Sequence, residues 1–108
     1  MITYRELQLD AIGDKTRRAI LARLRKGPLA VGEIARAFPM SRPAISQHLR
    51  VLKKAKLVTD TADGNRRLYQ LNPEGFDSLR AFFDEFWGQA LVSFRARIES
   101  TASEEDEK

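Results

Sequence analysis

One short segment, residues 41–55, carries side chains able to hydrogen-bond to nucleic acid. If the segment is a helix, Ile45, Leu49 and Leu52 form its buried stripe, at a spacing of four and then three residues. The start and the opposite face of the helix then carry Ser41, Arg42, Pro43, Ser46, Gln47, Arg50 and Lys54. A glutamine amide can pair with the edge of adenine, and arginine with guanine or a phosphate. No acidic residue interrupts this face, which favours contact with DNA over an ordinary solvated surface.

Few other kinds of chemistry are available to this chain. It has no cysteine, which excludes disulfides, thiolate metal sites and cysteine nucleophiles. Its single histidine, His48, makes a structural zinc site improbable, and a packed or partly exposed structural role is expected for it. With no pair of carboxylates in a plausible cleft, we expect no enzyme, no cofactor and no metal.

Charge is distributed unevenly along the 108 residues. The net charge is +4, but residues 1–72 hold 15 Lys or Arg against 6 Asp or Glu, whereas residues 73–108 hold 4 against 9. A basic module followed by an acidic segment is consistent with a nucleic-acid partner, because phosphate neutralisation supplies most non-specific affinity. Solvated surface charge would produce the same imbalance, so charge alone does not distinguish a nucleic-acid partner from an ordinary basic surface.

The length fits one domain, and periodicity predicts the elements that position residues 41–55. We expect helices over 3–12, from Asp14 to about Lys26, over 31–38, over 41–55 and from Pro73 to about Ile98. Strand-like runs at 57–62 and 66–71 flank Asp63-Gly64-Asn65, which predicts a β-hairpin. The expected organisation is a domain over 1–99 and an acidic, disordered tail over 100–108.

Two helices joined only by Pro39 and Met40 predict a helix-turn-helix, whose second helix would enter the major groove of DNA. The hairpin after it would form a wing that reaches the DNA backbone or the minor groove. Arg66 and Arg67 follow the tip of this wing on opposite faces of one strand, so only one of them needs to touch DNA.

The combination of MSRPAISQHLRVLKKAKLV and DGNRRLYQL resembles the winged helix-turn-helix of the ArsR-type bacterial repressors. TRRAILARLRKGPLAVGEIARAF fits the two preceding helices, and the resemblance covers about residues 3–98. It implies a mainly α-helical, dimeric transcription regulator with a small β-hairpin. The DNA-binding positions that it implies are Ser41, Arg42, Pro43, Ser46 and Gln47 in the helix and Gly64, Asn65, Arg66 and Arg67 in the wing.

The chain departs from this family in three places. The well-known members sense metals through cysteines or through His, Asp and Glu clusters, and metal sensing does not transfer to a chain without cysteine. Lys56 stands where the family usually has glycine after the recognition helix. Ala30 precedes the 31–38 helix where a serine or threonine cap is usual, which predicts a weaker helix start.

An aromatic stripe dominates the last helix, and a dimer interface with some core is the favoured interpretation. The expected interface residues are Tyr4, Leu7, Ile12, Phe82, Phe83, Phe86, Trp87, Leu91 and Phe94. An apolar pocket for a small-molecule inducer at the same place is the alternative, and a protein inducer also stays open.

The sequence predicts a cytoplasmic protein, since it has no apolar run of membrane-spanning length and no signal peptide. The function expected is a homodimeric, DNA-binding repressor that recognises a palindromic operator. A second hypothesis is a winged-helix module that binds another protein without reading DNA, although the basic helix face argues against it.

Overall fold

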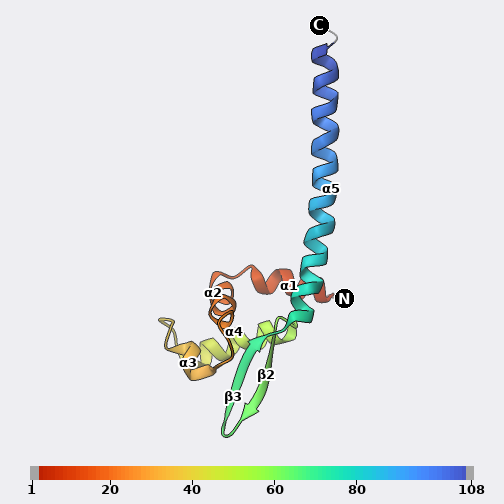
Figure 1. Cartoon of the computed structure of the whole chain (residues 1–108). Coiled ribbons are helices and arrows are strands. Elements are labelled where there is room, and N and C mark those ends of the chain that lie inside the picture. The colour runs from red at the N-terminus through yellow and green to blue at the C-terminus, as the bar shows by residue number, and fades with distance from the viewer. Residues whose placement is uncertain (1–2, 107–108) are drawn as a thin grey trace.

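The computed structural model describes residues 3–106, and five helices and three short strands make up this part of the chain (Figure 1). In chain order the elements are α1 (Tyr4–Ile12), α2 (Lys15–Leu24), β1 (Leu29–Ala30), α3 (Val31–Ala35), α4 (Arg42–Lys54), β2 (Val58–Asp63), β3 (Arg66–Leu71) and α5 (Pro73–Asp106). The predicted fold class, mainly helical with a hairpin and a helix-turn-helix, is confirmed.

Side chains cap the helices that lead into the helix-turn-helix. Thr3 Oγ1 accepts a hydrogen bond from the backbone N–H of Glu6, and the Glu6 carboxylate accepts one from the N–H of Thr3. Asp14 Oδ1 accepts from the N–H groups of Thr16 and Arg17 at 2.8 and 3.0 Å, which confirms its predicted capping role. These contacts satisfy N–H groups that the first turn of a helix leaves unpaired.

The helix predicted over 31–38 is shorter, because α3 ends at Ala35. The N–H groups of Ala37 and Phe38 donate to carbonyls only three residues earlier, so the chain tightens before Pro39 ends it. The helix start at Ala30 has no side-chain cap, but Glu33 Oε1 accepts from the Ala30 N–H at 3.1 Å. Glu33 therefore compensates in part for the missing serine or threonine.

The hairpin belongs to a three-stranded antiparallel sheet of order β1-β3-β2. Asp63 pairs with Arg66, so Gly64 and Asn65 alone form the turn, and only Gly64 has a positive φ, of 65°. Sequence reasoning missed the two-residue strand β1, in which Leu29 pairs with Tyr69. Through this pairing β1 joins the wing to the start of α3.

The core lies where α1, α2 and α4 meet β2 and the first turns of α5. Its buried apolar side chains are Ala11, Ile20, Leu21, Leu24, Ile34, Ile45, Leu49, Leu52, Ala55, Leu57, Val58 and Leu79. Gln8 of α1 is also buried, and its Nε2 donates to the carbonyls of Ala55 and Gly75 at 3.1 and 3.2 Å. One amide thus joins α1 to the end of α4 and the beginning of α5.

α5 is the longest element and projects away from the other elements (Figure 1). With α5 included, the described chain measures 74 × 28 × 27 Å. The sequence predicts a disordered segment over 100–108, whereas in the structure α5 extends through residues 100–106. Residues 101–106 contain no proline or glycine, and alanine and glutamate favour helices, so the helix can continue. Residues 107 and 108 lie outside the described residues.

Lys56, at the end of α4, adopts a left-handed conformation with φ 59°. A lysine there pays the steric cost of its Cβ, which glycine would avoid. We expect Lys56→Gly to raise the free energy of unfolding by about 1 kcal/mol, measured by urea denaturation. An unchanged or lower stability would show that the lysine side chain contributes more than the backbone strain costs.

Candidate nucleic-acid interface

The recognition-helix candidate α4 begins at a serine cap. Ser41 Oγ accepts from the backbone N–H of Ala44 at 3.3 Å, and Pro43 occupies the first turn, where its missing N–H costs nothing. Ile45, Leu49 and Leu52 are fully buried, as the spacing predicted. This packing fixes which face of α4 points away from the core.

The predicted DNA-reading residues of α4 lie on that outer face. Ser41, Arg42, Pro43, Gln47, Arg50 and Lys54 are exposed, and Ser46 is half-buried. Arg50 Nη1 donates to Gln47 Oε1 at 3.0 Å, which orients the glutamine amide. The face is rich in hydrogen-bond donors and has no carboxylate of its own. It can therefore approach phosphates without charge repulsion.

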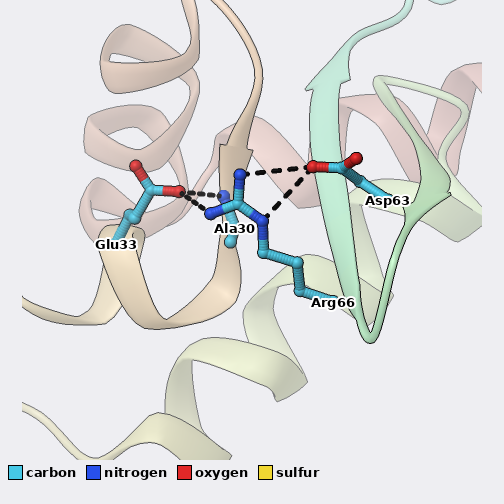
Figure 2. A network of polar contacts seen from close by, with 4 residues as sticks. All are labelled: Ala30, Glu33, Asp63 and Arg66. Atoms are coloured by element: carbon cyan, nitrogen blue, oxygen red, sulfur yellow. Dashed lines mark hydrogen bonds and ion pairs between the residues drawn. The ribbon is translucent and has the colours of Figure 1, made fainter.

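Arg66 lies in the wing between two carboxylates (Figure 2). Its guanidinium contacts Asp63 Oδ2 at 3.2 Å within the hairpin and Glu33 Oε1 of α3 at 3.3 Å. Glu33 serves both this ion pair and the start of α3. The wing is thereby tied to the first helix of the helix-turn-helix.

Arg67 is held on the other face of the hairpin by Asp60. Its Nε donates to Asp60 Oδ2 at 2.6 Å, while Lys53 Nζ of α4 contacts Asp60 Oδ1 at 2.8 Å. Hydrogen bonds from Lys53 and Arg67 hold the pKa of Asp60 below its ordinary value, and Asp60 in turn raises the pKa of Arg67. The second helix of the helix-turn-helix is thus also tied to the wing.

Sequence reasoning missed the carboxylates that hold the wing, namely Glu33, Asp60 and Asp63, and also Lys53. The hairpin register could have predicted one of these carboxylates, Asp60, as a partner of Arg67. Ala62 pairs with Arg67, which puts Asp60 diagonally opposite Arg67 on the same face. The distant partners Glu33 and Lys53 require the tertiary packing.

His48 of α4 is half-buried, which agrees with the structural role expected for it. Its Nδ1 lies 3.5 Å from Arg17 Nη1, and the same arginine donates through Nε to the carbonyl of Ala11 at 2.7 Å. His48 therefore belongs to the packing between α4, α2 and the end of α1. Among the side chains that the structure describes, no three His, Cys, Asp or Glu come together as a metal ion would require.

A second candidate surface runs along α5. Phe83, Phe86, Trp87, Leu91, Val92, Phe94 and Ile98 are large apolar side chains with an exposed fraction of 36% or more. Of the other residues predicted at a dimer interface, Leu7 and Ile12 pack partly against the core, and Phe82 is half-buried with the Arg5 guanidinium 4.9 Å from its ring centre. The side chain of Tyr4 lies outside the described part of the chain. No helix among the described residues is both long and apolar enough to cross a membrane.

Comparisons with known proteins identify the same architecture. Residues 14–60 match the model of the "Bacterial regulatory protein, arsR family". The chain is 54% identical over 102 residues to the HTH-type transcriptional regulator Rv2034 of Mycobacterium tuberculosis, covering 93% of this chain and 95% of that protein. It is 45% identical over 62 residues to the transcriptional repressor SdpR of Bacillus subtilis, covering 57% and 69% of the two chains.

A solved structure supports the fold independently. The homodimeric winged helix-turn-helix DNA-binding domain Mb0332 of Mycobacterium bovis, a fragment of residues 1–100, superposes with a TM-score of 0.62 at 29% identity. The match covers 79% of each chain.

Proposed function

This chain belongs to the arsR family of bacterial regulatory proteins and is a winged-helix transcriptional regulator, and we propose that it represses transcription as a homodimer on a palindromic operator. The observation that carries this proposal is the outer face of α4, which is exposed and basic beside a hairpin that carries two more arginines. Two such helices related by a two-fold axis would reach half-sites about one helical turn, ~34 Å, apart.

We assign distinct roles to the parts of this surface. The first half of α4, comprising Ser41, Arg42, Pro43, Ser46 and Gln47, would read base edges in the major groove. Arg50 and Lys54, farther along the helix, would contact phosphates. In the wing, Gly64 and Asn65 allow a close backbone approach, while Arg66 and Arg67 supply positive charge to the DNA backbone or minor groove.

The homodimer would form through α5 with the help of α1. A single copy exposes a line of large apolar side chains on α5, and such surfaces on soluble proteins mark interaction sites. The homodimeric state of the Mycobacterium bovis domain supports the same arrangement. The proposed interface comprises Tyr4, Leu7, Ile12, Phe82, Phe83, Phe86, Trp87, Leu91 and Phe94.

Repression would follow from occupying the promoter, and the repressor name of the Bacillus subtilis relative supports it. Induction requires an event that disfavours the spacing at which both recognition helices fit DNA. An organic molecule or a protein partner can supply that event, and the proposal includes no metal.

The test is selection from a random pool of duplexes, followed by titration of the recovered duplex against a scrambled one at about 0.15 M salt. We expect the recovered sequence to be an imperfect palindrome bound at least about 10³-fold more tightly than the scrambled duplex. Failure to enrich any sequence would contradict the proposal and favour a winged-helix module that binds protein.

Gln47→Ala should remove base discrimination at one position of each half-site. Loss of a bidentate contact to adenine costs about 1–3 kcal/mol, and the effect should be confined to that base pair. A binding scan over single-base variants of the operator measures it. If the variant discriminates every position as the unmodified protein does, Gln47 reads no base.

A further inference from the structure

Asp60 is a nearly buried carboxylate at the edge of the proposed DNA-binding surface. Its side chain is 5% exposed, and each of its oxygens contacts a cation, Oδ1 the Lys53 ammonium and Oδ2 the Arg67 guanidinium. The two cations remain more than half exposed, at 53% and 57%. The cluster therefore has a fixed, buried negative centre and two cationic side chains that extend from it to the surface.

The cluster joins the two parts of the molecule that would touch DNA. Lys53 lies in the last turn of α4, and Arg67 lies on β3 in the wing. The hydrogen bond from Arg67 to Asp60 uses Nε, and that from Lys53 reaches the other oxygen. Asp60 thus sets the direction of the arginine side chain relative to the recognition helix.

The cluster also limits how much charge this surface offers to phosphates. Lys53, Arg67 and Asp60 together carry a net charge of +1. Breaking a buried ion pair by removing one partner leaves the other without compensation, so the carboxylate and its cations behave as one unit. A phosphate that approaches either cation meets the field of Asp60 as well.

We propose that Asp60 is a specificity-determining residue, a positioning carboxylate that aims Arg67 at one place on the operator and suppresses binding to unrelated DNA. This inference rests on the proposed function. In the specific complex Arg67 gains from a fixed direction, because less freedom is lost on binding. On unrelated DNA the protein binds in no single register, so the fixed direction brings no such gain, and the negative charge of Asp60 opposes non-specific contact.

The experiment compares the unmodified protein with Asp60→Asn on the selected duplex and on a random-sequence duplex over a range of salt concentrations. The substitution keeps the shape of the side chain and raises the net charge of the cluster to +2. One more neutralised phosphate steepens the slope of log K against log salt by about 0.9, which is about an 8-fold larger loss of affinity over a tenfold rise in salt. We expect tighter binding to the random duplex and a preference for the selected duplex that is about 5- to 10-fold smaller.

Asp77→Asn is the matched control, because it makes the same change in charge at an exposed position near the start of α5. It should keep both the slope and the preference. The double variant Asp60→Asn with Lys53→Gln returns the cluster to +1 and should restore the slope, which a mere folding defect in Asp60→Asn would not allow.

Lys53→Gln alone tests the same cluster without changing the buried Asp60. This variant keeps the Asp60–Arg67 ion pair. It lowers the net charge of the cluster to zero, so the slope should become shallower by up to about 0.9. Unchanged slopes in Asp60→Asn and Lys53→Gln, or equal effects in Asp60→Asn and Asp77→Asn, would overturn the inference. If the unmodified protein itself selects no duplex, the proposed function fails instead.

Discussion

Phe86→Glu is expected to convert the protein to a monomer and to weaken operator binding by about 10²–10⁴-fold. The Phe86 ring is 56% exposed in a single copy and packs edge-on against Trp87, with ring centres 6.3 Å apart. Placing a carboxylate in an apolar interface requires it to lose water without gaining a partner. A monomer then binds one half-site without the effective concentration that the linked second half-site provides.

Light scattering gives the oligomeric state, and titration onto the selected duplex gives the affinity. Gln89→Glu is the matched control, since it adds the same charge to α5 beside Asp84, Glu85 and Gly88. It should leave a dimer with full affinity. A stable Phe86→Glu dimer would show that the dimer interface lies elsewhere and does not include the aromatic face of α5.

The helix-turn-helix could be predicted from the sequence because its signals are local. The cap at Ser41, the proline in the first turn and the apolar spacing of Ile45, Leu49 and Leu52 all lie within about three turns of one helix. The hairpin was predictable for the same reason, since its turn residues and its strand-like runs are adjacent. The outer face of α4 could be predicted because it lies opposite the buried Ile45, Leu49 and Leu52.

The contacts that hold the wing could not be predicted, because they join residues far apart in the chain. Arg66 reaches Glu33 across 33 positions, and β1 is too short to have a periodicity of its own. The sequence places Arg66 and Arg67 on opposite faces of one strand, so that only one needs to touch DNA, and it gives no sign of what holds either side chain. The structure instead gives each a carboxylate partner, so the wing has a set orientation before it meets a ligand.

α5 is longer than the helix predicted to end at about Ile98, because an acidic, polar composition gives no amphipathic signal for its last turns. Extending an existing helix costs far less than nucleating a new one, and α5 already has many turns before residue 100. Amphipathic patterning therefore predicts an apolar face on α5 and carries no information on how far the polar turns extend.

The packing of α5 against the end of α4 could not be predicted from the sequence either. A substitution at this contact should have the second large effect, on stability. Gly75, in the first turn of α5, lies against Lys56, which follows the end of α4 by two residues. A Cβ at this position would lie 1.7 Å from the Lys56 carbonyl oxygen and 2.6 Å from its carbon. Because both atoms are backbone, no side-chain rotation can relieve the clash. Either α5 or the turn between α4 and β2 would need to shift.

Gly75→Ala should therefore lower the free energy of unfolding by about 3 kcal/mol or more, a large part of the stability of a small domain. The shift would also disturb the hydrogen bond from Gln8 Nε2 to the Gly75 carbonyl. Since that amide also binds the Ala55 carbonyl at the end of α4, DNA affinity should fall even where the variant remains folded.

Urea denaturation at one fixed protein concentration measures the stability, because unfolding of a dimer depends on concentration. Gly88→Ala makes the identical change within the same helix, where an added Cβ meets nothing within 4 Å. It should raise the stability by up to about 1 kcal/mol, since alanine favours a helix over glycine. If the two variants unfold alike, α5 does not dock as closely on the turn after α4 as the structure places it.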